Sequence, residues 1–183
     1  MRLSQETIRT IPWYLKPFFW NQKRKYGAYL EPARVWAVIP RLFIAVASVY
    51  GVLDRKKSPL SPELRSLISV RVAQMNGCRF CVDMNSALFV KRAHTNAKIQ
   101  ALAQWRESSL LTDLEKAALH YAEQMTQVNQ EIDDECFNHL RHYFDEKTMI
   151  ELTALIAFQN MSSKFNSALG IAPQGFCNKP TEQ

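Results

Sequence analysis

Apolar residues recur every three or four positions along most of this 183-residue chain, which is the spacing of helices that bury one face. The clearest stretch follows Ser61, a good N-cap residue, and Pro62, which fits the first helical position. The stretch ends at Asn76-Gly77, because both residues tolerate the left-handed conformation that closes helices. Its stripe consists of Leu64, Leu67, Ile68, Arg71, Val72 and Met75.

The same spacing predicts seven further helices, and together they indicate an all-α fold of about eight helices. Two of them occupy residues 26–54 and are separated at Pro40, and a third begins near Cys78 and runs past Leu88. The others are a short helix within 94–106, one opened by the capping box Thr112–Glu115, one over 132–144 and a long one over 146–168. Only five glycines are present, which fits a helical chain with few tight turns.

A C-x-x-C motif, Cys78-Arg79-Phe80-Cys81, lies at the junction of two predicted helices. A cysteine in the first turn of a helix meets unpaired N–H groups and the positive end of the helix dipole, and both favour the thiolate. Residues three apart share a helix face, so Cys78 and Cys81 can close a disulfide with little movement. Asn85 lies one turn beyond Cys81, where a side chain can hydrogen-bond the second sulfur.

Three interpretations of the motif compete. A zinc site usually needs four ligands, and no second C-x-x-C or H-x-x-x-H pair follows at a suitable spacing, so we expect no metal. Two inert buried cysteines are a second possibility, since free cysteine is often a core residue. A redox-active dithiol is favoured, because the pair opens a helix beside Arg79.

The chain resembles the carboxymuconolactone decarboxylase superfamily, specifically its AhpD-like alkylhydroperoxidase branch. The resemblance is carried by residues 26–53, 64–93, 111–126 and 150–170, with NGCRFC and QNMSSKFN as the most specific pieces. It implies an AhpD-like helical bundle with the C-x-x-C at the start of a central helix. It also implies a homo-oligomer (a dimer, trimer or hexamer) with thiol peroxidase activity, which needs no metal or organic cofactor.

The family's chemistry implies roles for both cysteines. A peroxide substrate oxidises one cysteine to a sulfenic acid, the other resolves it to a disulfide, and a dithiol reductant restores both thiols. The resemblance makes Cys81 the peroxidatic residue and Cys78 the resolving one. Proximity to the helix start instead favours Cys78 as the more acidic thiol. We prefer the family order, because sulfenate formation also needs a neighbour such as residue 85.

The chain departs from the family motif at both positions of its proton relay. Ser66 stands where the family has glutamate and Asn85 where it has histidine, and neither can take a proton near neutral pH. Glu63, His120 and Asn160 are candidate supporting residues, although each also has a plainer structural interpretation. The sequence therefore predicts a weak peroxidase. The alternatives are a carboxymuconolactone decarboxylase-like lyase, against which the dithiol counts, or a non-catalytic oligomeric binding protein or oxidant sensor.

Charge divides the chain unevenly. Residues 1–57 hold eleven Lys or Arg and three Asp or Glu, whereas residues 58–183 hold twelve and fourteen. We expect residues 1–57 to form a basic, aromatic helical arm packed on an AhpD-like domain at residues 58–183. No nucleic-acid module accompanies the basic charge, so no nucleic-acid partner is expected. Pro12 and Pro17 argue against one long membrane-surface helix, so a membrane partner is not expected either.

The cysteine content and the apolar runs favour a cytoplasmic protein. Four cysteines in a chain of this length do not form a disulfide framework, and Cys136 and Cys177 are far from the C-x-x-C in sequence. No secretory signal is visible, because Pro12 and Pro17 interrupt the apolar residues near the start. The apolar, uncharged run at residues 42–53 is too short to cross a bilayer.

Overall fold

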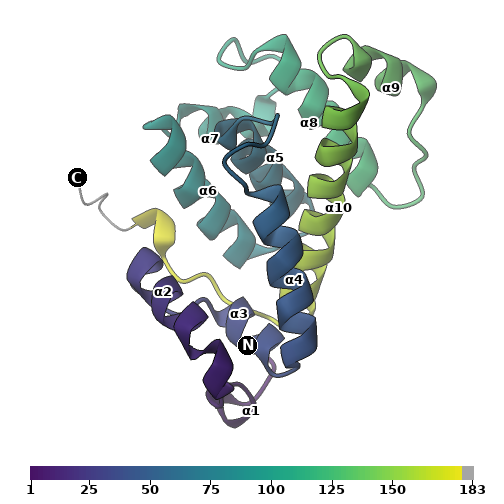
Figure 1. Ribbon diagram of the computed structural model, residues 1–183. Coiled ribbons are helices and arrows are strands. Elements are labelled where there is room, and N and C mark those ends of the chain that lie inside the picture. Colours follow the sequence, from purple (N-terminus) through teal and green to yellow (C-terminus); the bar gives the residue numbers. More distant parts are fainter. Residues whose placement is uncertain (179–183) are drawn as a thin grey trace.

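The computed structural model describes residues 1–178, and within them the chain is helical with no β-strand (Figure 1). This confirms the all-α prediction. The α-helices are α1 (Gln5–Arg9), α2 (Lys16–Tyr26), α3 (Glu31–Ala37), α4 (Pro40–Leu53), α5 (Pro62–Met75), α6 (Arg79–Ala93), α7 (Ala97–Ala101), α8 (Asp113–Thr126), α9 (Asp134–Arg141) and α10 (Glu146–Ala168). Three short 3₁₀-helices, η1 (Trp13–Leu15), η2 (Leu102–Gln104) and η3 (Phe176–Asn178), complete the described part.

The eight expected helices correspond to α3–α10, and the first 26 residues add α1 and α2. Pro17 lies at the start of α2, where a proline costs no hydrogen bond because the first helical N–H groups have no partner within the helix. Pro12 lies between α1 and η1, so it separates the two helices. The prolines thus divide this segment without preventing helix formation.

Capping side chains fix where the central helices begin. Ser61 accepts a hydrogen bond from the Leu64 N–H at the start of α5, and Thr112 forms a full capping box with Glu115 at the start of α8. Asp145 accepts from the Thr148 N–H and opens α10. Each cap gives an unpaired N–H group a partner, so these boundaries follow from local sequence.

The core is built around α5, of whose 14 residues nine are buried. One face of α5 packs on α6, and the others pack on α8 and α10. The largest apolar cluster joins α5, α8 and α10, with the fully buried Ile68, Leu152 and Ile156 at its centre. This packing holds the end of α5, and therefore the C-x-x-C that follows it, against the side of α10.

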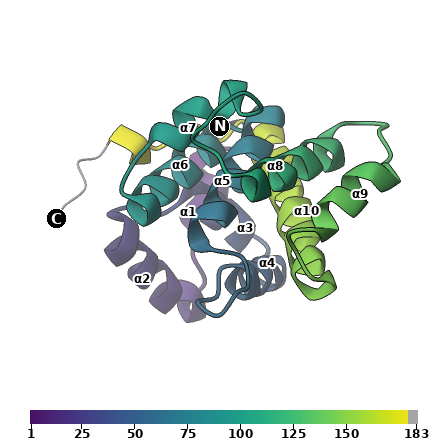
Figure 2. The same ribbon diagram turned by 90° about the horizontal axis from the view of Figure 1, so that it is seen from above.

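The N-terminal helices cover the end of the bundle opposite α8 and α9 (Figures 1 and 2). Phe19, Trp36 and Phe43 from α2, α3 and α4 form an apolar cluster that includes Phe165 of α10. Trp36 stacks on Phe165 with ring centroids 3.5 Å apart. A neighbouring apolar cluster joins Val35 of α3 to Phe80 and Cys81, so α3 lies close to the first turn of α6.

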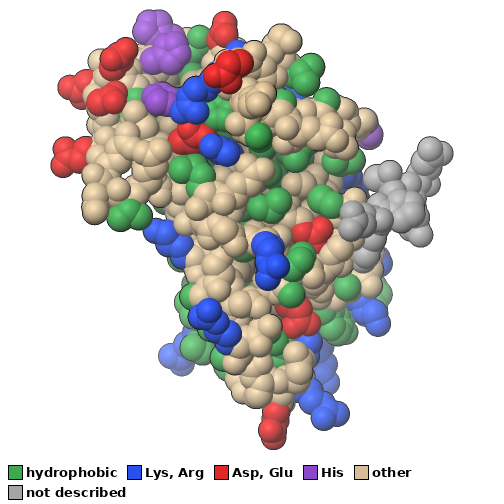
Figure 3. Space-filling model, turned by 180° about the vertical axis from the view of Figure 1, so that it is seen from behind, with side chains coloured by type: hydrophobic (Ala, Val, Ile, Leu, Met, Phe, Trp, Pro, Cys, Tyr) green, Lys and Arg blue, Asp and Glu red, His purple; other side chains and the backbone are tan. Residues whose placement is uncertain are grey.

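Charge follows the same division. On the face seen in Figure 3, most Lys and Arg side chains lie over the lower part of the molecule, which the N-terminal helices form, while Asp, Glu and His gather at the upper end near α9. Within residues 1–178, none of the helices has the length and apolar character needed to cross a membrane.

Candidate functional site

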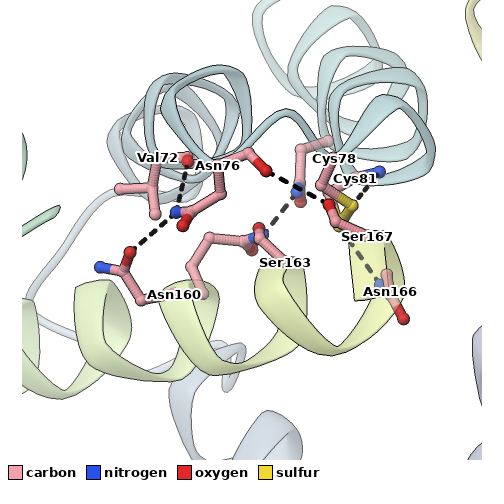
Figure 4. Close-up of a disulfide and its surroundings, with 10 residues drawn as sticks. Val72, Asn76, Cys78, Cys81, Asn160, Ser163, Asn166 and Ser167 are labelled. Atoms are coloured by element: carbon pink, nitrogen blue, oxygen red, sulfur yellow. Dashed lines mark hydrogen bonds between the residues drawn. A yellow bond between two sulfur atoms is a disulfide. The ribbon is translucent and has the colours of Figure 1, made fainter. Parts of the chain in front are cut away.

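The turn between α5 and α6 is fastened to α10. Asn76 Nδ2 donates to the Val72 carbonyl at 2.9 Å and to Asn160 Oδ1 at 2.7 Å, and Ser167 Oγ donates to the Asn76 carbonyl (Figure 4). Gly77 has φ +62°, the left-handed conformation that reverses the chain here. The start of α6 is therefore held by side chains as well as by core packing.

Cys78 and Cys81 form a disulfide at this start. Cys78 is the N-cap of α6, and its sulfur accepts a hydrogen bond from the Cys81 N–H at 3.2 Å. Cys78 is 2 % exposed and Cys81 is 4 % exposed. When the bond is reduced, a charge on the Cys78 sulfur faces the N–H groups and positive dipole of α6, both of which stabilise a thiolate.

Asn166 of α10 is the side chain that reaches the second sulfur. Its Nδ2 donates to Cys81 Sγ at 3.3 Å, the residue is 2 % exposed, and its Oδ1 has no hydrogen-bond partner among the described residues (Figure 4). The expectation that residue 85 holds this position is wrong. Asn85 Nδ2 instead donates to Gln159 Oε1 at 3.4 Å, because α6 and α10 run in opposite directions and each turn along α6 meets an earlier turn of α10.

Cys81 lies in the wall of a cavity of about 280 Å³. The sulfur side is formed by α6 and α10, and the opposite side by α2, α3 and α4. Its lining is mostly apolar and includes Trp36, Phe43, Phe80, Met84, Leu88 and Phe158. Of the two bonded cysteines, Cys81 lies among the described lining residues and Cys78 does not. A molecule in the cavity therefore lies beside Cys81 rather than beside Cys78.

The two relay positions lie on either side of a second, smaller void of about 40 Å³, which Ser66 and Asn85 both line. Ser66 is 2 % exposed, and its Oγ accepts a hydrogen bond from Arg92 Nη1 at 2.8 Å. Arg92 Nη2 also pairs with Asp54 Oδ1 at 2.7 Å. The position where the family has a carboxylate therefore holds a neutral hydroxyl beside a cation.

The other candidate residues lie away from the sulfurs. Glu63 is partly exposed in the first turn of α5, and His120 Nε2 is 3.4 Å from Gln124 Nε2 on α8. Asn160 bonds to Asn76 and Thr126 and so supports the turn. None of the three is among the described residues that line either cavity.

Tyr50 is a lining residue that the sequence did not single out. It lines both cavities. Burial of its hydroxyl raises the pKa of Tyr50 well above its usual range, and the nearby Tyr26 and Asp54 raise it further by smaller amounts. The side chain as a whole is 41 % exposed, so the burial concerns its hydroxyl end. Its hydroxyl stays protonated and is able to donate a proton or a hydrogen bond.

The remaining cysteines are protonated thiols. Burial, with a smaller effect of Asp133, raises the pKa of Cys136 to about 11. Burial and then Asp83 also raise the pKa of Cys177, whose sulfur donates to the Asp83 carbonyl. Neither cysteine is bonded to another.

Fold and site together define a helical protein with a buried dithiol–disulfide pair facing an apolar cavity. The sequence profile of the carboxymuconolactone decarboxylase family matches residues 40–124. The uncharacterized protein YnjA of Escherichia coli strain K12 is 44 % identical over 176 residues, which cover 96 % of this chain and 97 % of that protein. The chain belongs to the carboxymuconolactone decarboxylase family, and its fold is that of the AhpD-like branch.

Two solved structures show the extent of the shared fold. The first is the alkylhydroperoxidase AhpD core of an uncharacterized peroxidase-related protein from Ralstonia eutropha JMP134, with a TM-score of 0.85 at 20 % identity over 96 % of this chain and 93 % of that chain. The second is the debrominase Bmp8, with a TM-score of 0.80 at 21 % identity over 97 % of this chain and 92 % of that chain. The N-terminal helices are therefore part of the shared fold.

Proposed function

We propose that this protein is a thiol-dependent peroxidase that cycles Cys78 and Cys81 between dithiol and disulfide. The observation that carries the proposal is the position of Cys81, which belongs to a disulfide and lines a mostly apolar cavity that opens to solvent. That lining favours an alkyl hydroperoxide over hydrogen peroxide, because an apolar body gains free energy on leaving water and hydrogen peroxide has none.

The cycle starts from the two thiols. The Cys81 thiolate attacks the outer oxygen of the hydroperoxide, the O–O bond breaks, and the alkoxide takes a proton and leaves as an alcohol. The Cys78 thiolate then attacks the Cys81 sulfenic acid, which forms the disulfide and releases water. A dithiol reductant supplies two electrons and two protons to restore the thiols. Cys81 acts first because it lines the cavity, and Cys78 attacks second from behind it.

Two side chains of the cavity support these steps. Asn166 Nδ2 donates to the Cys81 sulfur and stabilises the thiolate, while its unpartnered Oδ1 offers an acceptor for the O–H of the hydroperoxide. Tyr50, whose hydroxyl stays protonated, lines the same cavity and can donate a hydrogen bond to the departing oxygen, which takes its proton from water. Without the family's carboxylate and imidazole the reaction is slow, by about the 10²–10⁴-fold that general acid–base catalysis usually contributes.

The decisive experiment follows peroxide consumption under dithiothreitol, with cumene hydroperoxide and hydrogen peroxide as substrates and thiols titrated before and after. Wild type is compared with Cys81→Ser and with the matched control Cys136→Ser. We expect turnover that is faster with cumene hydroperoxide, is lost in Cys81→Ser and is kept in Cys136→Ser. Loss of two thiols in a single round without turnover would instead identify an oxidant sensor, and no thiol loss would identify inert structural cysteines.

A second candidate reaction is the reductive removal of bromine from an apolar ring. One structure of the debrominase Bmp8, with a TM-score of 0.79 to this chain, contains 2,3,4-tribromopyrrole. The cavity favours this reaction because its described lining holds flat aromatic side chains and neither a carboxylate nor an imidazole. The two thiols would become a disulfide while C–Br becomes C–H and bromide and a proton leave. Bromide release that depends on Cys81, without peroxide turnover, would favour this reaction.

We also propose that the active form is a homo-oligomer built on α4. Leu42, Ala45, Val49 and Val52 form an exposed apolar stripe with alternating spacings of three and four residues. Arg41 and Asp54 carry opposite charges at the two ends of α4. If α4 of a second copy packed antiparallel on this helix, it would cover the stripe and bring Arg41 of each chain near Asp54 of the other. Val49→Lys should reduce the mass measured by light scattering, while Ile150→Lys, at an exposed position on α10, should not.

We place this chemistry in the cytoplasm, where a dithiol reductant is available. The unpaired thiols of Cys136 and Cys177 support a reducing compartment, because exposed thiols such as Cys177 oxidise in the extracellular space.

A further inference from the structure

Among the described residues that line the cavity beside Cys81, one is charged. Lys25, in the last turn of α2, lies among its described lining residues, and these include no aspartate or glutamate. Lys25 is exposed, whereas Cys81 is buried, so the cavity wall extends from the solvent-exposed surface to the disulfide. Aromatic and aliphatic side chains line the space between them. A ligand that fills this space has its polar end beside a cation.

From this arrangement we propose that Lys25 selects substrates in which a carboxylate terminates an apolar body, so that the natural hydroperoxide is an acidic, amphipathic one. The inference rests on the proposed peroxidase function and adds the substrate class. A cavity of about 280 Å³ is roughly twice the ~150 Å³ that holds one benzene ring. By that measure it accommodates an apolar body on the order of ten carbon atoms.

The surroundings of Lys25 strengthen its attraction for an anion. Lys23 and Arg24 share the last turn of α2, and the first 57 residues carry a large excess of basic residues. Such a field raises the local concentration of anionic ligands. Lys25 Nζ lies 4.9 Å from the ring centre of Tyr26, another lining residue, so the ammonium group contacts a side chain of the cavity wall.

A binding measurement on the oxidised protein tests the inference without any turnover. Octanoate and octan-1-ol share an apolar chain and differ at the polar end, and the quenching of tryptophan fluorescence reports their binding because Trp36 lines the cavity. We expect octanoate to bind about fivefold more tightly at low salt, which corresponds to the ~1 kcal/mol of a favourable exposed ion pair. The preference should weaken at high salt.

Lys23→Gln is the matched control, because it removes the same charge from the same turn at a residue outside the described lining. Lys25→Gln should abolish the preference for octanoate and leave octan-1-ol binding unchanged, while Lys23→Gln should keep most of it. Equal affinities of the two ligands for wild type would overturn the inference. Equal loss of the preference for octanoate in both variants would also overturn the inference. The preference would then come from the overall positive electrostatic potential of α2 and not from Lys25.

Turnover supplies the second measurement. For a fatty-acid hydroperoxide and its methyl ester, Lys25→Gln should raise the KM of the acid about fivefold and leave that of the ester unchanged. If cumene hydroperoxide is turned over but octanoate shows no preference, the inference alone fails. If octanoate binds through Lys25 but no peroxide is consumed, the peroxidase proposal fails while the carboxylate site stands.

Discussion

Restoring the proton relay by the double substitution Ser66→Glu plus Asn85→His should increase peroxide turnover. Both positions border the same void of about 40 Å³, into which the longer glutamate side chain can extend. Asn85 also lines the larger cavity, one helical turn beyond Cys81. A histidine there lies between the new carboxylate and the sulfur, which is the order that a relay requires.

The size of the gain is limited by Arg92. A general acid–base relay contributes about 10²–10⁴-fold, and the base is most effective when its pKa lies near the working pH. Arg92 Nη1 lies 2.8 Å from Ser66 Oγ, so a carboxylate introduced at this position would pair with it and have a lowered pKa. The same pairing gives the buried charge a partner and keeps the fold intact. We therefore expect a gain near the lower limit, about 10²-fold in kcat/KM.

The assay compares kcat/KM for cumene hydroperoxide in wild type, the two single variants and the double variant, with folding checked by thermal unfolding. Each single variant should gain little, because a relay needs both groups, so the double-mutant cycle should show coupling of about 2.8 kcal/mol. A folded double variant with wild-type turnover would refute the reasoning. Full gain from Asn85→His alone would refute it as well, since residue 66 would then have no part in it.

Three further predictions concern single residues. Asn166→Leu removes the hydrogen-bond donor to the Cys81 sulfur, so it should raise the pKa of the Cys81 thiol in the reduced protein by about one unit. Thiolate absorbance measures this pKa, and the control Asn160→Leu should leave it unchanged. Cys136, with its pKa raised to about 11, keeps a proton that the unfolded chain releases above about pH 9. The free energy of unfolding should therefore fall between pH 9 and 11 by up to roughly 3 kcal/mol. A fall of the same size in Cys136→Ala would show that ionisation of Cys136 is not its cause. Trp36→Ala removes a stacked ring from the cavity wall, so it should lower the free energy of unfolding measured by chemical denaturation by about 3–5 kcal/mol. The same variant should raise the KM for bulky peroxides. An unchanged KM would show that substrates do not contact this wall.

The sequence predicted those features that depend on neighbouring residues. Periodicity located α5 and α6, and the caps at Ser61 and Thr112 marked helix starts, because an N-cap acts within its own first turn. The pairing of Cys78 with Cys81 is equally local. The cavity was not foreseen, because its walls join α2–α4 to α6 and α10 through contacts between residues far apart in sequence.

The same distinction separates the correct and incorrect predictions at the sulfurs. The absence of a base at Ser66 and Asn85 is visible in the residue types themselves. Which amide reaches Cys81 depends on how α10 packs across α6, so Asn166 rather than Asn85 holds that position. The position of Asn166 in the sequence does not by itself specify that its amide reaches the sulfur. The charge of Lys25 likewise does not reveal that this residue borders the cavity.

Of the two disulfide cysteines, only Cys81 is among the described residues that line the cavity, and this has a kinetic consequence. In the proposed cycle the hydroperoxide and the reductant both reach Cys81 from this cavity, so neither can bind while the other is present. The protein should then obey a double-displacement rate law, with parallel lines in double-reciprocal plots. At high concentration the reductant should inhibit competitively against the peroxide. When a thiol attacks Cys81, Cys78 leaves as a thiolate, and the start of α6 stabilises its negative charge. The same geometry that shields the disulfide from solvent therefore favours its reduction by a thiol that enters the cavity.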